Sequence, residues 1–464
     1  MGSRPTEIAL AFALLALGAL PARAAVDEDA PPPPPSDAHA RPGAAIVYDL
    51  PPRPSDARSR ACSFRTPVCV HYTDRPEAAA AVLASAERAW DVLTGALDLP
   101  APDVDPDTLA YDVWLTADED LATTHLAARD VRSRIDRARA FTTVTAKAKA
   151  GCALDASVTR AIARAILFRT SPATDEGVAR AQVAYLTDLV VPCAAGLEVD
   201  AAQAFQAHPD RAVCDAHAFA TPPLADAAPS RADMLFADGA SLFWSRVDWA
   251  YARTPGGLVR ATWALSPTMT DVGARSFRDE PDTFDVLRVT FKGALTTKST
   301  LADLLLDTAV ARAFLGAADD GVHQPETRRL GDAAKVAIDW DLPWPAQPKR
   351  VAPRAPVAPT GSSYLVIHRA GAPPGSRLRV EIAWEEHALF RWALVKLDAK
   401  GAELGRVVIP TPERATEAQM TLVDLDATDR VLLVGANAGD PAYAFDPDDA
   451  VWEPHGWLVT IASE

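Results

Sequence analysis

Histidines are the residues of this chain whose number and spacing bear most directly on chemistry. A helix that binds a catalytic zinc ion needs two histidines four positions apart, with a glutamate beside the first, because that spacing places both imidazoles on one face. The nine histidines stand at positions 39, 71, 125, 208, 217, 323, 368, 387 and 455, and no two are four apart. A G-x-S-x-G elbow, a Walker loop and a dinucleotide-binding glycine motif are also absent from the sequence. None of these enzyme sites is therefore predicted.

A few side chains could still contribute to a site by themselves. His71 lies in the segment VCVHY, where a partly buried strand residue is a simpler interpretation than a catalytic one. The acidic run from Asp446 to Asp449 could bind Ca²⁺ through its oxygens, but we favour a solvated turn. Four tryptophans could line a platform that binds carbohydrate, but filling of a hydrophobic core explains them more simply. They are Trp384, Trp392, Trp452 and Trp457.

Residues 1–24 predict a cleavable secretory signal peptide. Arg4 is followed by an apolar run from Ile8 to Leu20 and by the triplet Ala22-Arg23-Ala24, after which we expect cleavage. As a helix the run would reach about 20 Å, which is short of the ~30 Å hydrocarbon core of a membrane. No later segment is long and apolar enough to remain in a membrane after cleavage. We therefore expect a protein that is secreted, periplasmic or held at the cell envelope.

Export makes disulfides the expected state of the five cysteines. Cys62 and Cys69 flank the segment SFRTPV, whose proline favours a bend and hence a small closed loop. Cys152 precedes one predicted helix and Cys193 ends the next, so the two meet if these helices form an antiparallel hairpin. Cys214 is the competing partner of Cys193. One thiol must remain free.

Length and charge limit the possible partners. With 464 residues and 49% hydrophobic residues, the chain is long enough for at least two hydrophobic cores. Its formal net charge of −16 argues against nucleic acid, because a nucleic-acid partner demands a basic surface. We expect no cofactor and no metal, and a partner that is an unidentified protein or envelope component.

The predicted elements describe an α+β arrangement followed by an all-β sandwich. A proline-rich lead-in (25–61) precedes an α+β domain over 62–342. Strands are predicted at 68–72, 111–115 and 140–146, and helices at 77–97, 155–168, 175–191, 231–252, 257–265 and 300–315, with Asp155 as an N-cap. The proline-rich segment 343–359 predicts a linker. Strands at 363–367, 378–384, 390–397, 406–409, 419–425, 430–435 and 457–461 then predict a sandwich over 360–464.

A family resemblance lies in the order of these segments. The first part of the chain resembles the start of exported bacterial metallopeptidases of the zincin class, specifically gluzincin-like ones. The segments that carry this resemblance are, in order, VCVHYTDRPEAAAAVLASAERAWDVL, YDVWL, a helix and TDEGVARAQVAYLTDLVVP. SLFWSRVDWAYARTPGGLVRATWALSP resembles their helical second half, and the sandwich resembles their accessory β-domains. The resemblance implies a zincin-like fold for the first domain.

The resemblance also implies which residues occupy the zinc site. The matching helix has Arg160 and Arg164 at the two histidine positions of HExxH and Ala161 at the glutamate position, while Glu176 of the pair Glu176-Gly177 matches the third ligand. The site is therefore degenerate, and Arg160 and Arg164 either pair with Glu176 or lie on exposed helix surface. The predicted function is that of a non-catalytic metallopeptidase-like protein with a binding or scaffold role. The alternatives are an active secreted hydrolase with an unrecognised site, using residues such as His71, His125 and Glu176, or a structural surface protein.

Overall fold

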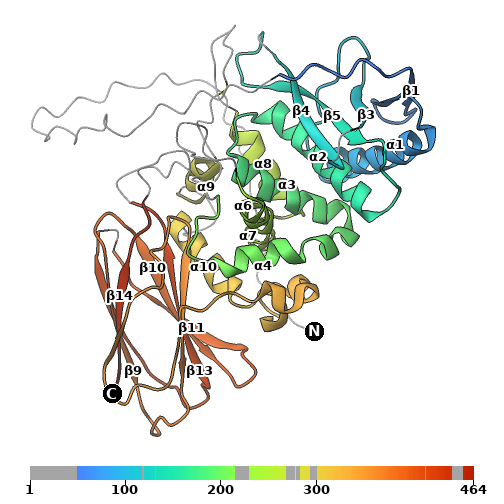
Figure 1. Ribbon diagram of the computed structural model, residues 1–464. Coiled ribbons are helices and arrows are strands. Elements are labelled where there is room, and N and C mark those ends of the chain that lie inside the picture. Colours follow the sequence, from blue (N-terminus) through green and yellow to red (C-terminus); the bar gives the residue numbers. More distant parts are fainter. Residues whose placement is uncertain are drawn as a thin grey trace, which may run out of the picture.

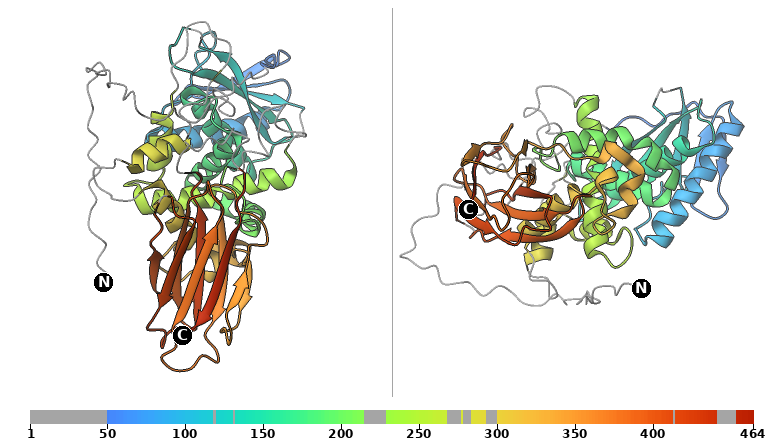
Figure 2. Two further views of the ribbon diagram at one scale, coloured as in Figure 1. Left: turned by 90° about the vertical axis from the view of Figure 1, so that its left-hand side faces the viewer. Right: turned by 90° about the horizontal axis from the view of Figure 1, so that it is seen from below.

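The computed structural model describes residues 50–117, 120–130, 132–214, 229–267, 277, 283–292, 300–412, 414–440 and 453–464. The predicted signal peptide, most of the lead-in, the acidic run at 446–449 and Trp452 lie outside these residues. The described chain is α+β, as expected. A mixed sheet lies at one end of the molecule and two packed sheets lie at the other, with most of the helices between them (Figures 1 and 2).

The N-terminal sheet has five strands in the order β1-β2-β3-β5-β4. The strands are β1 (Ser59–Cys62), β2 (Val68–Tyr72), β3 (Tyr111–Thr116), β4 (Ala122–Arg129) and β5 (Ala138–Thr145). β2, β3 and β5 are parallel, whereas β1 and β4 pair antiparallel at the two edges. β1 begins inside the segment predicted as a lead-in. Its residues pair with β2 from Ser59, which lies opposite Tyr72, to Cys62, which lies opposite Cys69.

Two helices pack together beside this sheet. They are α1 (Pro76–Trp90), which continues as a π-helical turn over Asp91–Ala96, and α2 (Cys152–Thr170). The prediction that Asp155 caps α2 was wrong, because the helix begins one turn earlier, after Gly151. Asp155 instead lies in the first turn and accepts hydrogen bonds from Ser85 and Arg88 of α1. The carboxylate thus ties the two helices together.

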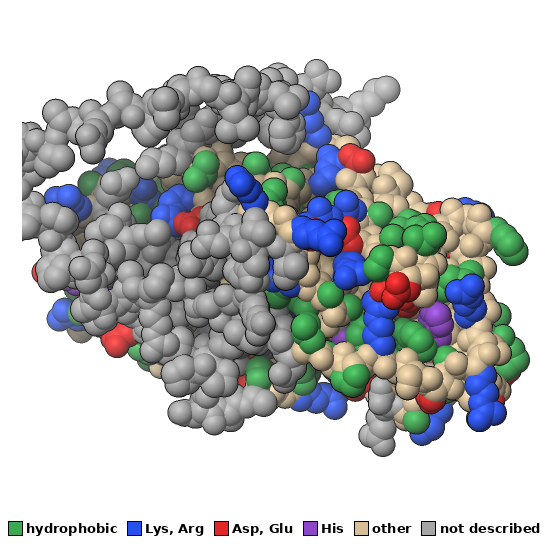
Figure 3. All heavy atoms as spheres, turned by 90° about the horizontal axis from the view of Figure 1, so that it is seen from above, with side chains coloured by type: hydrophobic (Ala, Val, Ile, Leu, Met, Phe, Trp, Pro, Cys, Tyr) green, Lys and Arg blue, Asp and Glu red, His purple; other side chains and the backbone are tan. Residues whose placement is uncertain are grey.

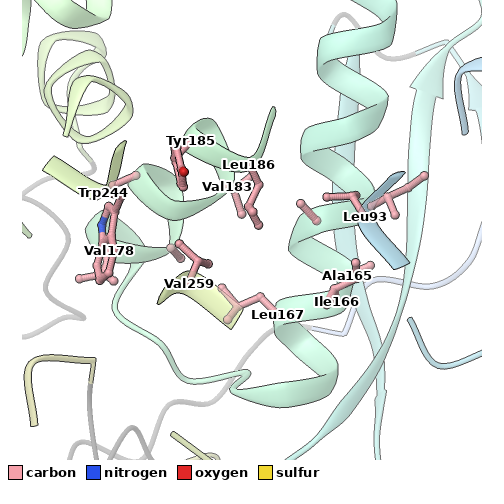
Figure 4. Close-up of a cluster of buried hydrophobic side chains, with 14 of the residues drawn as sticks. Leu93, Ala165, Ile166, Leu167, Val178, Val183, Tyr185, Leu186, Trp244 and Val259 are labelled. Atoms are coloured by element: carbon pink, nitrogen blue, oxygen red, sulfur yellow. The ribbon is translucent and has the colours of Figure 1, made fainter. Parts of the chain in front are cut away.

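The pair formed by α2 and α3 (Glu176–Val190) contributes much of the core. Asp175 is the N-cap of α3 and accepts a hydrogen bond from the Val178 amide at 3.1 Å. Figure 4 shows apolar side chains of the two helices directed into one cluster, which Leu93 and Val259 join from neighbouring segments. The burial of these faces fixes how the polar residues of α2 and α3 lie relative to each other.

Six further α-helices lie in the described residues of the middle of the chain. They are α4 (Val199–Ala207), α6 (Arg231–Gly239), α7 (Ser241–Tyr251), α8 (Gly257–Leu265), α9 (Thr283–Lys292) and α10 (Leu301–Arg312). The helix predicted over 231–252 is in fact two helices, α6 and α7, which meet at Ala240. A Cβ on Gly239 would lie 2.0 Å from the Ala201 carbonyl oxygen, so only glycine allows α6 to approach α4 this closely. Within the described ranges, no helix has the length and apolarity needed to cross a membrane.

The C-terminal part is a β-sandwich of two sheets that enclose one core. One sheet has the order β11-β10-β13-β8-β6 and the other β12-β9-β14-β7. Every strand predicted after position 360 is present: β8 (Ser362–His368), β9 (Leu378–Trp384), β10 (Phe390–Leu397), β11 (Glu403–Ile409), β12 (Glu417–Leu422), β13 (Arg430–Asn437) and β14 (Trp457–Ser463). Trp384, Trp392 and Trp457 are buried in this core, so they fill it.

The predicted linker at 343–359 is not a free connection. β6 (Trp340–Leu342) pairs with β8, and β7 (Lys349–Val351) pairs with β14, so the sandwich begins before the proline-rich segment and includes it. Val357 within this segment is fully buried. Helix α10 also packs on the sandwich, through a cluster that contains Val310, Tyr364 and Val434. The helical part and the sandwich therefore share buried surface.

Two disulfides close loops of very different length. Cys62 bonds to Cys69 across the β1-β2 turn. Cys152, at the start of α2, bonds to Cys193, just after α3, and not to Cys214. Cys214 is buried and takes part in neither of these disulfides. The disulfide that closes the longer loop therefore links the start of α2 to the segment just after α3. These two helices carry the candidate site.

Candidate functional site

The helix pair brings Arg164 and Glu176 into contact. Arg164 projects from the middle of α2 and Glu176 is the first residue of α3, and their Nη2 and Oε2 atoms are 2.5 Å apart. Gly177 lets this end of α3 pack tightly, because a Cβ there would lie 1.8 Å from the Cys214 carbonyl oxygen. The guanidinium of Arg164 also lies 4.9 Å from the centre of the Phe168 ring. Two of the four positions predicted from the resemblance thus form an ion pair.

Arg160, one turn earlier on α2, pairs with a carboxylate from a third helix. Its Nη1 atom lies 3.0 Å from Oδ2 of Asp238, at the end of α6. Arg180 of α3 binds the same carboxylate at 3.0 Å. Glu198, just before α4, is 3.7 Å from Nη2 of Arg160. We call these residues the arginine cluster: Arg160, Arg164, Glu176, Arg180, Asp238 and Glu198.

The donors of the arginine cluster do not fit a divalent metal ion. At the four positions matched by the resemblance, only Glu176 offers an oxygen ligand, because Ala161 has no ligand atom and arginine stays protonated. Three guanidiniums face the carboxylates of Glu176 and Asp238, so the balance of charge repels a cation. Across the described chain, no group of three or more His, Cys, Asp or Glu side chains is arranged to hold a metal.

The buried carboxyl group of Glu198 lies beside the partly buried carboxyl group of Asp188. Burial and the neighbouring Asp188 carboxylate together raise the pKa of Glu198 well above its ordinary range, against the opposing effect of Arg160. The Nη2 atom of Arg329 lies 3.5 Å from Oδ2 of Asp188. At neutral pH Glu198 is therefore a neutral acid, and it adds no negative charge to the arginine cluster.

Replacing Glu198 with Gln should make stability less dependent on pH. In the unfolded chain this carboxyl titrates near 4.5, whereas in the folded chain its pKa is raised. Between these two values the folded state holds a proton that the unfolded state releases, so wild-type stability falls as pH rises. Glu198→Gln removes this loss, and near pH 7 the variant should be more stable than wild type by about 1–3 kcal/mol.

Urea unfolding at several pH values measures this effect. The difference between Glu198→Gln and wild type should shrink to nearly nothing near pH 4, where Glu198 is protonated in both states. Glu386→Gln, at an exposed glutamate, is the control and should follow wild type throughout. A Glu198→Gln variant that is less stable than wild type at neutral pH would contradict the assignment.

Asp238 should contribute more to stability than Glu176, although both accept from arginines. The Asp238 side chain is 13% exposed and serves two guanidiniums, whereas the Glu176 side chain is 41% exposed and serves one. Asp238→Asn leaves two partly buried cations without a carboxylate and should cost about 2 kcal/mol in the free energy of unfolding. Glu176→Gln should cost at most about 1 kcal/mol, because solvent screens the exposed pair. Equal losses in urea unfolding would refute this ranking.

The other candidate residues have separate partners. His71 is buried in β2, where its Nε2 atom lies 2.8 Å from Oδ1 of Asp112 and its ring stacks on Trp114 at 4.0 Å. His125 of β4 lies 2.9 Å from the Thr143 hydroxyl. Glu176 contacts Arg164, so each of the three residues proposed for a hydrolase contacts a different neighbour. These contacts do not join the three residues into one site.

A second polar network was not predicted from the sequence. His323 is buried, and its two ring nitrogens lie 3.0 Å from Asp320 and 3.0 Å from Glu403 of β11. Burial alone would raise the pKa values of Asp320 and Glu403. Both pKa values are nevertheless lowered, because hydrogen bonds to the carboxylates, including those from His323, together outweigh the effect of burial. The network joins the helical part to the sandwich. Because Glu403 is distant from His323 in the sequence, no local sequence pattern predicts this contact.

Comparisons with known proteins give no family for this chain. No family model matches it, and no curated protein matches it. Over 25% of its length it is similar to the enzymatically active domain of bacteriophage CBA120 tailspike protein 4, with 7% identity and a TM-score of 0.17. Over 25% it is also similar to the infectious bursal disease virus VP2 subviral particle, with 9% identity and a TM-score of 0.15. The chain spans only 17% and 40% of those chains, and similarities this weak carry no argument.

Proposed function

We propose that this chain is an exported, non-catalytic protein of the metallopeptidase-like type, with a binding or scaffold role at the cell envelope or outside the cell. The observation that carries the proposal is the ion pair of Arg164 with Glu176. The resemblance assigns both positions to zinc ligands. A salt bridge between α2 and α3 thus stands where that family would use a metal to join the two helices.

The arrangement around α2 supports the same proposal. α2 follows the mixed sheet directly in the chain, which is the order that the resemblance leads us to expect. The Thr124 hydroxyl of the edge strand β4 donates to the Ala161 carbonyl at 2.9 Å, so this helix lies against the edge of the sheet. Arg160 is held by Asp238, which gives the second arginine a structural role as well.

Export is supported by the cysteines. The two disulfides place four of the five cysteines in bonds, and such bonds persist in oxidising compartments. Figure 3 shows both basic and acidic side chains on the described part of one face. For the whole chain, the formal net charge of −16 favours a protein or small-molecule partner over a polyanion.

A panel of peptide and ester substrates tests the absence of catalysis. We expect no turnover from the wild-type protein, with or without added zinc, and the same result from Glu176→Gln. Because Glu176 is the single residue that retains its expected type, turnover that disappears in Glu176→Gln would overturn the proposal. His71→Ala is the matched variant for the alternative hydrolase site. Turnover that disappears in that variant would favour the hydrolase.

A further inference from the structure

Exposed apolar side chains gather at one end of the N-terminal sheet. Strands β2, β3 and β5 are adjacent and parallel, so the loops that precede them lie at the same end of the sheet. Because neighbouring strands are about 4.8 Å apart, the points at which the three loops enter these strands span about 10 Å. The loops carry four large exposed apolar side chains, which we call the apolar tips: Phe64, Val104, Leu109 and Ile135.

Phe64 stands at the tip of the β1-β2 hairpin, with its side chain fully exposed. The hairpin is closed by the shorter of the two disulfides. The Ser63 hydroxyl also accepts hydrogen bonds from the Arg65 and Thr66 amides, each at 3.0 Å. A loop fixed in this way loses little conformational entropy when it binds, so the aromatic side chain is prepared for contact with a partner.

Leu109 is held outward by a strained backbone. Its side chain is 73% exposed, and its φ of 54° lies in the left-handed region that leucine rarely adopts. Two hydrogen bonds close the turn: the Leu109 amide donates to the Asp105 carbonyl at 2.8 Å, and the Asp105 amide donates to the Ala110 carbonyl at 2.9 Å. Asparagine suits this backbone better and would keep apolar surface out of water. The leucine therefore costs stability without serving the fold, which points to a role in binding.

The three loops are joined to one another. The Tyr111 amide, at the start of β3, donates to the Pro67 carbonyl of the hairpin at 2.7 Å. Arg137, at the end of the third loop, forms an ion pair with Asp103 of the second loop at 2.8 Å. The apolar tips are thus presented together on one base, which is the sheet.

Unpaired charge beside the apolar tips is mainly positive. Arg132 and Arg134, in the loop of Ile135, are exposed, and neither has an ion pair within the described residues. Among the described acidic residues of the three loops, only Asp107 likewise lacks such a pair. Guanidiniums bind phosphate oxygens well, so this rim suits a surface that carries phosphate groups. The net charge of −16 opposes a strongly anionic surface, which leaves a zwitterionic phospholipid as the fitting one.

We infer that the apolar tips attach this protein to the surface of a zwitterionic phospholipid bilayer, with Arg132 and Arg134 against the lipid phosphates. Side chains on separate loop tips suit a fluid bilayer, which adapts to them, whereas a protein partner must match them in shape. The inference rests on the exported location in the proposed function and not on the absence of catalysis. The apolar tips and the arginine cluster share no residue, so a failure to bind lipid leaves the proposed function intact.

Vesicle flotation tests the inference. The protein is purified after export, with removal of the predicted signal peptide checked by mass spectrometry, and mixed with vesicles of phosphatidylcholine and phosphatidylethanolamine. We expect the floating fraction of protein to grow with lipid concentration until it saturates. Because burial of apolar side chains drives this binding, most of it should persist in about 0.5 M NaCl. No flotation at any lipid concentration, as expected if the apolar tips bind a protein instead, would overturn the inference, and so would binding that is lost in salt.

Variants locate the contact. Phe64→Ser combined with Leu109→Asn should weaken vesicle binding at least about tenfold, because both changes remove apolar surface from the contact. Leu109→Asn alone should also raise the unfolding midpoint, because asparagine adopts the left-handed backbone more readily. Val408→Ser is the matched control, since it removes a 51% exposed apolar side chain from the sandwich, and it should bind like wild type. A folded double variant that binds like wild type, or an equal loss in Val408→Ser, would contradict the inference.

Discussion

Replacing Arg160 with His, Ala161 with Glu and Arg164 with His should convert the arginine cluster into a zinc site. The three changes remove two positive charges and supply two imidazoles on one face of α2, in reach of the carboxylate of Glu176. Three protein ligands of this kind are the usual set for a catalytic zinc ion, so we expect about one zinc per chain after dialysis. Asp238 keeps Arg180 as a partner in this variant.

Two control variants separate zinc coordination from the loss of charge. Arg160→Ala with Arg164→Ala removes the same positive charges without adding ligands and should bind no zinc. Adding Glu176→Ala to the triple substitution should release the metal, because two ligands from one helix do not complete a site. A triple variant that keeps the wild-type circular dichroism spectrum but binds no zinc would show that α2 and α3 are not arranged as the resemblance implies.

Loss of the disulfide between Cys152 and Cys193 should be the most destabilising change in the N-terminal half of the molecule. The bond spans 41 positions of sequence, for which the chain-entropy relation gives about 4 kcal/mol of stabilisation. It also holds the start of α2 against the segment that follows α3, where Ala156, Val191 and Ala194 form a small buried cluster. Cys152→Ala with Cys193→Ala should therefore lower the free energy of unfolding by about 4 kcal/mol, as measured in urea.

The other disulfide provides the matched control. Cys62 and Cys69 are separated by only 7 positions, so Cys62→Ala with Cys69→Ala should cost about 2 kcal/mol by the same relation. A loss for this pair that equals or exceeds the loss for Cys152 and Cys193 would mean that loop length does not determine the effect.

The strands of the sandwich could be predicted from sequence because their residues alternate between core and surface. In β9 the exposure of successive side chains alternates, with Val380, Ile382 and Trp384 buried, and the predicted bounds of this strand were correct. β7 was missed because it lies among prolines, which usually end strands, although its three residues pair with β14. β4 was missed because ATTHLAAR has no clear alternation, and neighbouring β5 and α2 position it instead.

Only the local part of the candidate site could be predicted. Arg160, Arg164 and Glu176 lie on consecutive helices, so helical spacing and the resemblance were enough to propose them. Asp238 and Glu198 come from segments whose positions depend on tertiary packing, and no sequence period connects them to α2.

The zinc content of the purified full-length wild-type protein tests the central claim most directly. The protein is incubated with excess zinc, freed of unbound metal by gel filtration and measured by elemental analysis, with the triple variant of α2 as the positive control. We predict no stoichiometric zinc in wild type, because guanidiniums occupy the positions that the resemblance assigns to zinc ligands and Glu176 is already paired with Arg164. One tightly held zinc ion per wild-type chain would contradict the account.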